Sequence, residues 1–355
     1  MTTAVAMSGG LDSSLVAALL AESGESVLGL SMLLWDRSEE ARNGRCCGSL
    51  DLGDARRVAQ QVGIPHYTLR MDDEFERQVV DPFVDDYLAG RTPSPCVRCN
   101  TFIKFDAFVD RAAQLGAERI ATGHYARIVE ADDELELHRA VDERKDQTYF
   151  LFELDQEQLG RACFPLGEMT KAEVRREADR RDLVVAGKAE SMDICFVANG
   201  VEKFVGERIR GTPAEARSGV ASTVVDESGS ELGRAGPTYR YTVGQRRGLR
   251  ISGSRPLYVL EIDADANRLV VGPVEELASN GLRGGGLHWI GAPPSGPIEA
   301  EVRIRSRHPG VAALVRPGAR GEVEVDFAEP QSGVAAGQAA VFYDGDRVLG
   351  GCWIR

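Results

Sequence analysis

Ser8-Gly9-Gly10-Leu11-Asp12-Ser13-Ser14 is the stretch of sequence that decides the fold of the N-terminal half. It follows a short apolar run over 3–7, typical of a strand, and opens a helix-like stretch over 14–22. The two glycines let backbone N–H groups approach an anion closely, and the helix N-terminus adds donors and a favourable dipole. Serine hydroxyls add further hydrogen bonds. The stretch therefore predicts a phosphate-binding loop between a strand and a helix.

The absence of one common motif from the sequence excludes one type of phosphate-binding loop. GxxxxGK[ST] occurs nowhere in the chain, so the loop is not a Walker P-loop. It resembles the pyrophosphate loop of enzymes that cleave ATP to AMP and pyrophosphate and so activate a carbonyl oxygen by adenylation. A match this short also has a plainer interpretation, an ordinary glycine-rich turn between a strand and a helix.

The N-terminal half alternates strand-like and helix-like segments. Repeated β-α-β units with apolar strands imply a doubly wound parallel sheet. Ligands of such sheets bind at the carboxyl ends of the strands, where the Ser8 loop, Met32 and Gly123 would all lie. The expected strands are 3–7, 27–34, 65–69 and 119–121, and the expected helices are 14–22, 50–62 and 100–115.

The C-terminal half changes character after a helix expected over 202–210, because short strands and Gly/Pro turns take over. Strands at this spacing favour barrels or sandwiches, and 281–286 and 292–297 are expected as turns. We predict three domains: an ATP-binding α/β domain over 1–204, a small central β domain over 205–275, and a C-terminal β-barrel over 276–355. The expected strands are 220–225, 239–242, 257–262, 268–271, 299–304, 312–315, 321–327, 339–343 and 347–353.

Composition indicates a cytoplasmic enzyme. The 355 residues are 43% apolar, which supports well-formed cores, but no run approaches the roughly 20 apolar residues of a membrane span. The N-terminus enters a strand directly, without the pattern of a signal peptide. A net charge of −13 argues against a generally basic nucleic-acid binder, although a local stripe of arginines can still contact phosphates.

Six arginines of the β domains are candidates for such a stripe. The alternative is that they lie on solvated strand faces and bind nothing. They are Arg246, Arg247, Arg250, Arg303, Arg305 and Arg307.

Seven cysteines, an odd number, argue against a structural disulfide framework. Cys163 and Cys352 lie in apolar surroundings and are expected in the core. Cys99 follows a proline-containing loop and precedes Asn100, a good N-cap for the next helix. A thiol beside a helix N-terminus, with Lys104 one turn on, should have a lowered pKa and be nucleophilic. Cys195 reads equally well as a core residue.

Cys96 and Cys99 form a CxxC pair with three interpretations that spacing alone leaves open. The pair could be half of a zinc site, but no second CxxC or HxxxH completes four ligands. It could be a redox pair. Together with Cys195, it could hold an iron–sulfur cluster with one open iron.

Taken together, the motifs resemble the tRNA-specific 2-thiouridylase family nearly end to end. The resemblance implies an adenine nucleotide hydrolase-like α/β domain followed by a central β domain and a barrel that contacts tRNA. The matching segments are SGGLDSS (8–14), GLSMLLWD (29–36), the Cys46-Cys47 pair, AGRTPSPCVRCNTFIKFD (89–106), ATGHYAR (121–127), KDQTYFL (145–151), SMDICFV (191–197), YTVGQRRGL (241–249), EVRIRSR (301–307) and GQAAVFYDGDRVLGG (337–351).

The resemblance also implies roles for individual residues. Cys195 would carry a persulfide sulfur, and Cys99 would be its partner nucleophile, forming a transient disulfide. The nucleotide-binding residues would be Ala6, Met7, Ser8, Gly9, Gly10, Leu11, Asp12, Ser13, Met32 and Gly123. The residues that touch tRNA would be Ser94, Pro95, Cys96, His124, Lys145, Asp146, Gln147, Arg305, Ser306 and Gln338, of which Ser94 to Cys96 lie at the target base.

The implied activity is ATP-dependent thiolation of C2 of the wobble uridine of tRNA, with AMP and pyrophosphate as the other products. Adenylation turns the C2 oxygen into part of a good leaving group, and magnesium would neutralise phosphate charge. The partners would be the anticodon arm of tRNA and a persulfide-donating sulfur carrier or cysteine desulfurase. A [4Fe-4S] cluster on Cys96, Cys99 and Cys195 is the alternative route.

The sequence departs from the family pattern in places. Cys96 stands where many relatives have Asp, and Ser94 where Asn is frequent. Ser306 replaces an aromatic type of residue, which weakens any expectation of base stacking there. Cys96 matters most, because it could be a bystander, a third redox thiol or a cluster ligand.

Two other functions are also compatible with the sequence. An amide-forming synthetase with the same loop would use ammonia and need no pair of reactive thiols. An RNA-binding scaffold with a vestigial nucleotide loop would bind tRNA without releasing pyrophosphate.

Overall fold

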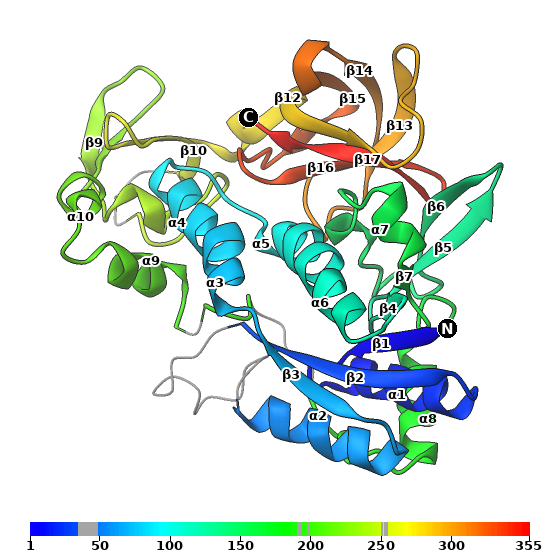
Figure 1. Ribbon diagram of the computed structural model, residues 1–355. Helices are drawn as coiled ribbons and strands as arrows, with labels where there is room; N and C mark the ends of the chain where they lie inside the picture. The colour runs from blue at the N-terminus through cyan, green and yellow to red at the C-terminus, as the bar shows by residue number, and fades with distance from the viewer. Residues whose placement is uncertain (35–48, 190–193, 198, 250, 252–254) are drawn as a thin grey trace.

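The computed structural model describes residues 1–34, 49–189, 194–197, 199–249, 251 and 255–355. A parallel sheet with helices on both faces occupies the lower part of Figure 1, a barrel lies above it, and a small β domain lies to the left. The predicted α/β class, with two further β domains, is confirmed. None of the described helices is long and apolar enough to cross a membrane.

The N-terminal sheet has the order β3-β2-β1-β4-β7, and all its pairings are parallel. The first strand, β1, lies between β2 and β4. The chain therefore adds β2 and β3 on one side of β1 and later adds β4 and β7 on the other side. This reversal creates a crevice at the carboxyl ends of β1 and β4. The strands are β1 (Thr2–Ala6), β2 (Ser26–Leu33), β3 (His66–Arg70), β4 (Arg119–Ala121) and β7 (Ala162–Cys163).

Alternating side chains of β1 supply two separate cores. Ala4 and Ala6 belong to one apolar cluster and Val5 belongs to the other, as the period of two in a strand requires. The Val5 side is covered by α1 (Leu11–Glu22), α2 (Ser49–Val62) and α8 (Lys171–Arg180). The Ala4 side is covered by α3 (Asp72–Phe75), η2 (Glu76–Val80), α4 (Asp81–Leu88), α6 (Phe108–Gln114) and α9 (Val201–Ile209).

The helix that carries Cys99 begins earlier than predicted. It starts as α5 (Pro95–Arg98), continues as the π-helix η3 (Cys99–Ala107) and ends as α6. Proline at the first helical position fits this start, because its missing N–H would have no helical partner there. Asn100 is not the N-cap. Its side-chain amide instead donates to the carbonyl of Phe150 at 2.8 Å, so Cys99 lies inside the helix.

The central domain is a four-stranded sheet with the order β10-β11-β8-β9, preceded by α10 (Pro213–Ser218). The prediction of a strand over 239–242 is wrong. It is largely taken up by the short helix η5 (Thr238–Arg240), which follows Pro237. The strands are β8 (Thr223–Val225), β9 (Glu231–Arg234), β10 (Tyr258–Asp263) and β11 (Arg268–Gly272).

The C-terminal domain is a closed barrel, because β12 pairs with both β15 and β17. The prediction of turns over 281–286 is wrong, since this segment lies inside β12. Its glycines permit close packing: a Cβ on Gly284 would lie 2.3 Å from the Cys352 sulfur. The strands are β12 (Ala278–Trp289), β13 (Ile298–Arg303), β14 (Val311–Pro317), β15 (Val323–Ser332), β16 (Ala339–Asp344) and β17 (Arg347–Ile354), with short helices η6 (Val274–Leu277) and η7 (Ala319–Gly321).

A hairpin from the N-terminal half joins the barrel. The strands β5 (Ala126–Ala131) and β6 (Glu134–Arg139) were not predicted, and β6 pairs antiparallel with β17. The hairpin extends the barrel sheet on the right of Figure 1. Two further short helices follow it, η4 (Thr148–Phe150) and α7 (Gln156–Gly160). Leu137, Phe152 and Val341 share one apolar cluster, so the first and last domains have a common core.

Candidate active site

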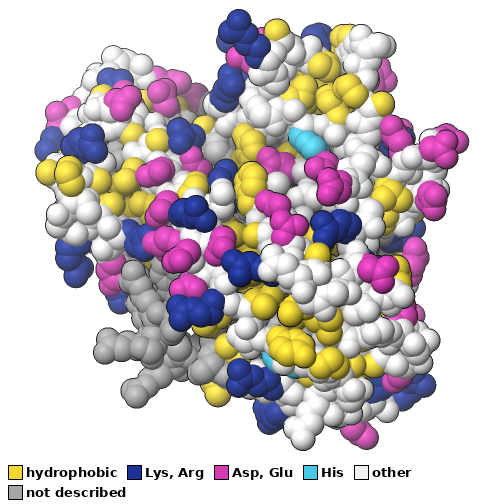
Figure 2. Space-filling model, viewed as in Figure 1, with side chains coloured by type: hydrophobic (Ala, Val, Ile, Leu, Met, Phe, Trp, Pro, Cys, Tyr) yellow, Lys and Arg dark blue, Asp and Glu magenta, His cyan; other side chains and the backbone are white. Residues whose placement is uncertain are grey.

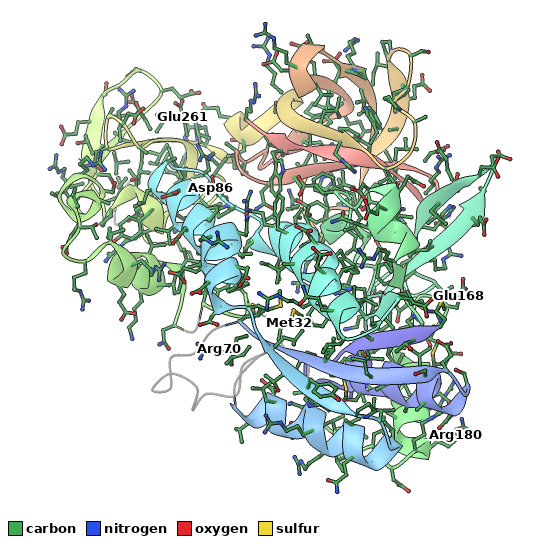
Figure 3. All side chains as sticks on the ribbon, in the orientation of Figure 1. Met32, Arg70, Asp86, Glu168, Arg180 and Glu261 are labelled. Carbon is green, nitrogen blue, oxygen red and sulfur yellow. The ribbon has the colours of Figure 1, made fainter. Side chains whose placement is uncertain are left out.

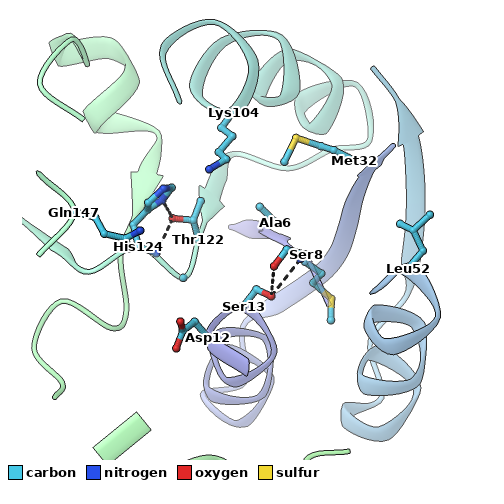
Figure 4. A pocket seen from close by; sticks show the side chains of 12 residues that line it. Ala6, Ser8, Asp12, Ser13, Met32, Leu52, Lys104, Thr122, His124 and Gln147 are labelled. Carbon is cyan, nitrogen blue, oxygen red and sulfur yellow. Dashed lines mark hydrogen bonds between the residues drawn. The ribbon is translucent and has the colours of Figure 1, made fainter. Parts of the chain in front are cut away.

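A pocket of about 230 Å³ opens at the carboxyl ends of β1, β2 and β4. Figure 4 shows its walls, with the Ser8 loop on one side and the helix that carries Lys104 on the other. Most of the residues predicted to bind nucleotide line it, while Gly9, Gly10 and Leu11 shape the loop behind. The lining residues are Ala6, Met7, Ser8, Asp12, Ser13, Met32, Leu52, Lys104, Thr122, Gly123, His124 and Gln147.

The loop has the backbone that close approach to an anion requires. Gly9 has φ of +73°, and a Cβ there would lie 2.1 Å from the carbonyl oxygen of Asp51. Gly10 occupies the N-cap of α1 without a side-chain cap, so N–H groups at this helix end need another partner. The Ser8 N–H donates to the Ser13 hydroxyl at 3.2 Å. The loop is therefore ordered by its own serines and leaves donors for an anion.

The loop after β4, which contains Gly123, packs closely against the start of α1. A Cβ on Gly123 would lie 2.9 Å from the Cβ of Asp12 and 3.0 Å from the Ser13 nitrogen. A larger residue at position 123 would fill the junction between the loops after β1 and β4. The glycine thus lets the two loops meet at the pocket.

Two lysines compensate carboxylates at the phosphate loop, and neither was predicted. The Lys171 ammonium donates to both oxygens of Asp12, at 2.7 and 2.9 Å, and the Tyr125 hydroxyl donates to Asp12 at 3.0 Å. Lys188 donates to the carbonyl oxygen of Gly9 at 2.9 Å and to the carboxylates of Asp51 and Asp54 at 2.6 Å. Both lysines come from segments more than 150 residues away from the loop, so no local pattern could have indicated them.

His124, predicted to touch tRNA, is buried at the pocket. Its Nδ1 lies 2.6 Å from the Thr122 hydroxyl, and its ring packs between Phe105 and Phe164. Burial, and secondarily the charge of Lys104, hold the pKa of His124 well below its usual value. The imidazole is therefore neutral at physiological pH and acts here as a hydrogen-bonding group.

Cys99 and Cys195 both contact the apolar cluster on the Ala4 side of the sheet. Cys99 is buried within it, and the half-buried Cys195 packs against it together with Met32. Met32, labelled in Figure 3 near the end of β2, also lines the pocket, so the pocket and the cluster share a wall. Both cysteines are free thiols in this structure. Residues 190–193 and 198, near Cys195 in the sequence, lie outside the described part of the chain.

The prediction of a lowered pKa for Cys99 is wrong. Burial raises the pKa of this thiol, and the nearby charge of Lys104 lowers it by less. The reason is the shift in helix register: Cys99 lies beyond the first turn, inside the cluster, rather than at an exposed helix end.

A metal-bound arrangement of the thiols receives no support. Cys96 is exposed while Cys99 is buried, and the described residues contain no group of three His, Cys, Asp or Glu side chains placed to hold a metal ion. Neither the half-zinc site nor the cluster on Cys96, Cys99 and Cys195 is supported by this geometry.

The residues predicted to contact tRNA fall into several places. Ser94 and Pro95 are buried at the start of α5, and only Cys96 of that trio is exposed. Gln338 donates to the carbonyls of Thr92 and Pro93, at 2.8 and 3.4 Å, and so holds the α5 loop against the barrel.

The Lys145-Asp146-Gln147 segment contributes mainly internal contacts. The Asp146 carboxylate is 2% exposed and lies 3.3 Å from the Arg303 guanidinium, and burial raises its pKa. Gln147 accepts a hydrogen bond from the Tyr125 N–H at 2.9 Å and lines the pocket. Lys145 is half-buried in the turn before it.

The arginine stripe is only partly available. Arg303 is turned inward to Asp146 and Glu301 and lies over the Tyr343 ring, which removes it from the stripe. Arg305 and Arg307 are exposed, with Ser306 half-buried between them, and Arg250 lies outside the described residues. On the face in Figure 2, basic and acidic side chains are interspersed.

Comparisons with known proteins agree along the whole chain. Residues 1–199 match the family model described as a tRNA methyl transferase HUP domain, 215–273 a tRNA methyl transferase PRC-barrel domain, and 279–354 an aminomethyltransferase beta-barrel domain. A protein of Solibacter usitatus named tRNA-specific 2-thiouridylase MnmA is 48% identical over 99% of this chain and 98% of its own. Proteins of the same name from Geobacter metallireducens (49%; 99% and 95%) and Geotalea uraniireducens (48%; 99% and 94%) are similarly close.

Proposed function

Since the chain belongs to the tRNA-specific 2-thiouridylase family and is thereby a tRNA sulfurtransferase that acts on uridine, we propose how the reaction runs on this chain. ATP adenylates the C2 oxygen of the wobble uridine, and sulfur from a persulfide on Cys195 replaces that oxygen, with Cys99 as partner nucleophile. The products are 2-thiouridine, AMP and pyrophosphate.

One observation carries the proposal: Met32, which lines the pocket beside the anion-binding loop, packs on the same apolar cluster as the two thiols. Met32 lines the pocket that contains Ser8 and Ser13 and packs on the cluster that contains Cys99 and Cys195. Thiolation of a carbonyl carbon needs this proximity, because the activated oxygen must leave from the carbon that sulfur attacks.

The phosphate loop would bind the pyrophosphate part of ATP. Ser8 and Ser13 line the pocket at the N-terminus of α1, and Lys171 neutralises Asp12 so that its carboxylate does not repel the phosphates. ATP supplies an adenylyl group, which converts a poor leaving oxygen into AMP.

The thiol chemistry balances without another oxidant. The Cys99 thiolate attacks the inner sulfur of the Cys195 persulfide, forms a Cys99–Cys195 disulfide and releases hydrosulfide, which attacks C2 as AMP departs. An external thiol reductant then resets the two cysteines. Burial raises the pKa of Cys99, so the thiol form predominates in the structure and must lose its proton before it attacks.

Magnesium would accompany the phosphates of ATP. The described residues supply no group of three acidic, His or Cys side chains for a metal ion, and the Asp12 carboxylate at the pocket is already paired with Lys171. The proposal therefore assigns magnesium to the phosphates and no step to a protein-bound metal.

The target base must leave the anticodon stack to reach the pocket. The exposed Cys96 and the α5 loop, held by Gln338, are proposed to receive it, and Arg305 to contact the RNA backbone. Sulfur would arrive from a persulfide-carrying protein, and the reaction would take place in the cytoplasm.

The direct test is nucleoside analysis of tRNA from cells that lack this protein, combined with the purified enzyme, unmodified tRNA, ATP and a persulfide donor. We expect loss of 2-thiouridine in the cells, and 2-thiouridine plus one AMP per thiolated base in the tube. Thiolated tRNA that persists in the cells, or a methylated nucleoside as the product, would overturn the proposal. A methylated product would instead agree with the names of two matching family models, which are described as tRNA methyl transferase domains.

A further inference from the structure

One cation at the pocket has no partner in the described part of the chain. Lys104 lines the pocket, and its ammonium forms no ion pair or hydrogen bond with any described residue. The other two lysines near the phosphate loop are committed: Lys171 is paired with Asp12, and Lys188 with Asp51 and Asp54. An uncompensated cation in a concave site is an open position for an anion.

The position of Lys104 across the pocket is informative. In Figure 4 its side chain extends from the helix toward the pocket, on the wall opposite Ser8 and Ser13 and beside Thr122. An anion held between this ammonium and the loop would contact donors on both sides. The pyrophosphate part of ATP would occupy the loop, so the group left for Lys104 is the α-phosphate.

The π-helix places this cation on the sulfur side of the pocket. Lys104 follows Cys99 by five residues within η3, and a π-helix brings residues at this spacing one turn apart. In agreement with this spacing, the charge of Lys104 lowers the pKa of Cys99, against the larger opposing effect of burial. The same side chain therefore faces the nucleotide pocket and influences a reacting thiol.

We propose that Lys104 is a catalytic residue that binds the α-phosphate of ATP and stabilises the AMP leaving group as sulfur attacks. The inference rests on the proposed function, because only adenylation of the base places an α-phosphate between the loop and the thiols. Negative charge grows on that phosphate as the bond from C2 to oxygen breaks. A fixed ammonium in a partly buried site stabilises this charge more than water does.

The test compares AMP with adenosine, which differ in this phosphate, on three variants: Lys104→Met, Lys104→Arg and the control Lys203→Met. Lys203 lies on α9 with a largely exposed side chain that pairs only loosely with Glu207 at 3.8 Å. Calorimetry should show that Lys104→Met weakens AMP binding by about tenfold or more and leaves adenosine binding unchanged. Lys104→Arg should keep most of the AMP affinity, and Lys203→Met should match the wild type.

Single-turnover thiolation at saturating ATP adds a kinetic measurement. We expect Lys104→Met to slow the step by about 10²-fold and to leave the tRNA dissociation constant unchanged. AMP affinity that equals the wild type in Lys104→Met, or an equal loss for adenosine, would overturn the role of Lys104 and leave the proposed function intact. A wild-type protein that binds neither ligand and makes no 2-thiouridine would overturn both.

Discussion

Two neighbouring parts of the site are built on different principles: the phosphate loop that lines the pocket (the phosphate-loop wall), and the adjacent apolar cluster that contains Cys99 and packs on Cys195 (the thiol wall). On the phosphate-loop wall, seven consecutive residues supply the turn, the helix start and the hydroxyls, and fixed ion pairs such as Asp12–Lys171 balance the charge. On the thiol wall, Cys99 and Cys195 come from segments nearly 100 residues apart and meet in an apolar cluster that raises the pKa of Cys99. The proposed anion site is thus a local property of the chain, whereas the meeting of the two thiols depends on the packing of the whole domain.

The largest expected effect lies on the thiol wall. Cys99→Ser and Cys195→Ser should each reduce thiolation with a persulfide donor by at least about 10³-fold while ATP binding stays unchanged, because the loop is built separately. Cys163→Ser, a change at a half-buried thiol at the end of β7, is the control. If Cys195→Ser thiolates tRNA at the wild-type rate with inorganic sulfide and with the persulfide donor alike, the persulfide role is wrong.

The loop wall is tested by glycine substitutions. Gly9→Ala combines a positive φ with a Cβ 2.1 Å from the Asp51 carbonyl oxygen, whereas Gly24→Ala has φ of +81° and open space around the new Cβ. Each change costs about 1–2 kcal/mol of backbone strain. Only Gly9→Ala should also displace the loop and weaken ATP binding by more than about tenfold. Equal ATP affinity in the two variants would show that the Gly9 turn does not shape the anion site.

Charge balance at the loop should have a smaller effect. Lys171→Met leaves the Asp12 carboxylate without its main cation beside the expected phosphates. We expect ATP affinity to fall by about tenfold and to recover in part in the double variant Asp12→Asn/Lys171→Met, because the second change removes the unpaired charge. Additive losses in the double-mutant cycle would mean that Lys171 contacts ATP directly rather than through Asp12.

The smallest effect concerns pH and His124. Its pKa in the folded protein lies well below the usual value near 6.5, so below that pH the unfolded chain binds more protons than the folded one. Stability should therefore fall as pH decreases from about 7 to 5, by up to about 1.4 kcal/mol per pH unit from this group. Denaturant titrations at several pH values should show that the free energy of unfolding of His124→Gln falls less steeply with decreasing pH than that of the wild type. An identical slope would locate the pH dependence elsewhere, with the buried His308 as the next candidate.

Sequence predicted what depends on local order. The loop at 8–14, the apolar strands of the first sheet and most barrel strands follow from spacing, because their signals lie within a few residues. The start of the Cys99 helix was misplaced because Asn100 is a good cap by type, but its amide binds the Phe150 carbonyl instead. The β12 glycines resembled a turn because nothing local shows that Val325 and Cys352 lie against them.

The charge partners at the site could not be predicted for the same reason. Lys171 and Lys188 reach the loop only once the parallel sheet has formed. Arg303 follows the pattern of an exposed strand residue, yet Asp146, from another domain of the sequence, draws it inward. The pKa of Cys99 likewise depends on the cluster packed around it rather than on its neighbours in sequence.

The β5–β6 hairpin has a consequence for how firmly the parts of the molecule are joined. Because β6 pairs with β17, main-chain hydrogen bonds join the barrel to the nucleotide-binding half, in addition to their common core. The four-stranded central sheet shares no strand pairing with either neighbour in the described residues and has an apolar cluster of its own. The barrel and the nucleotide-binding half are thereby joined along the backbone, whereas side-chain packing, such as that of the buried Tyr239 in the cluster that contains Ala4, joins the central domain to the same half.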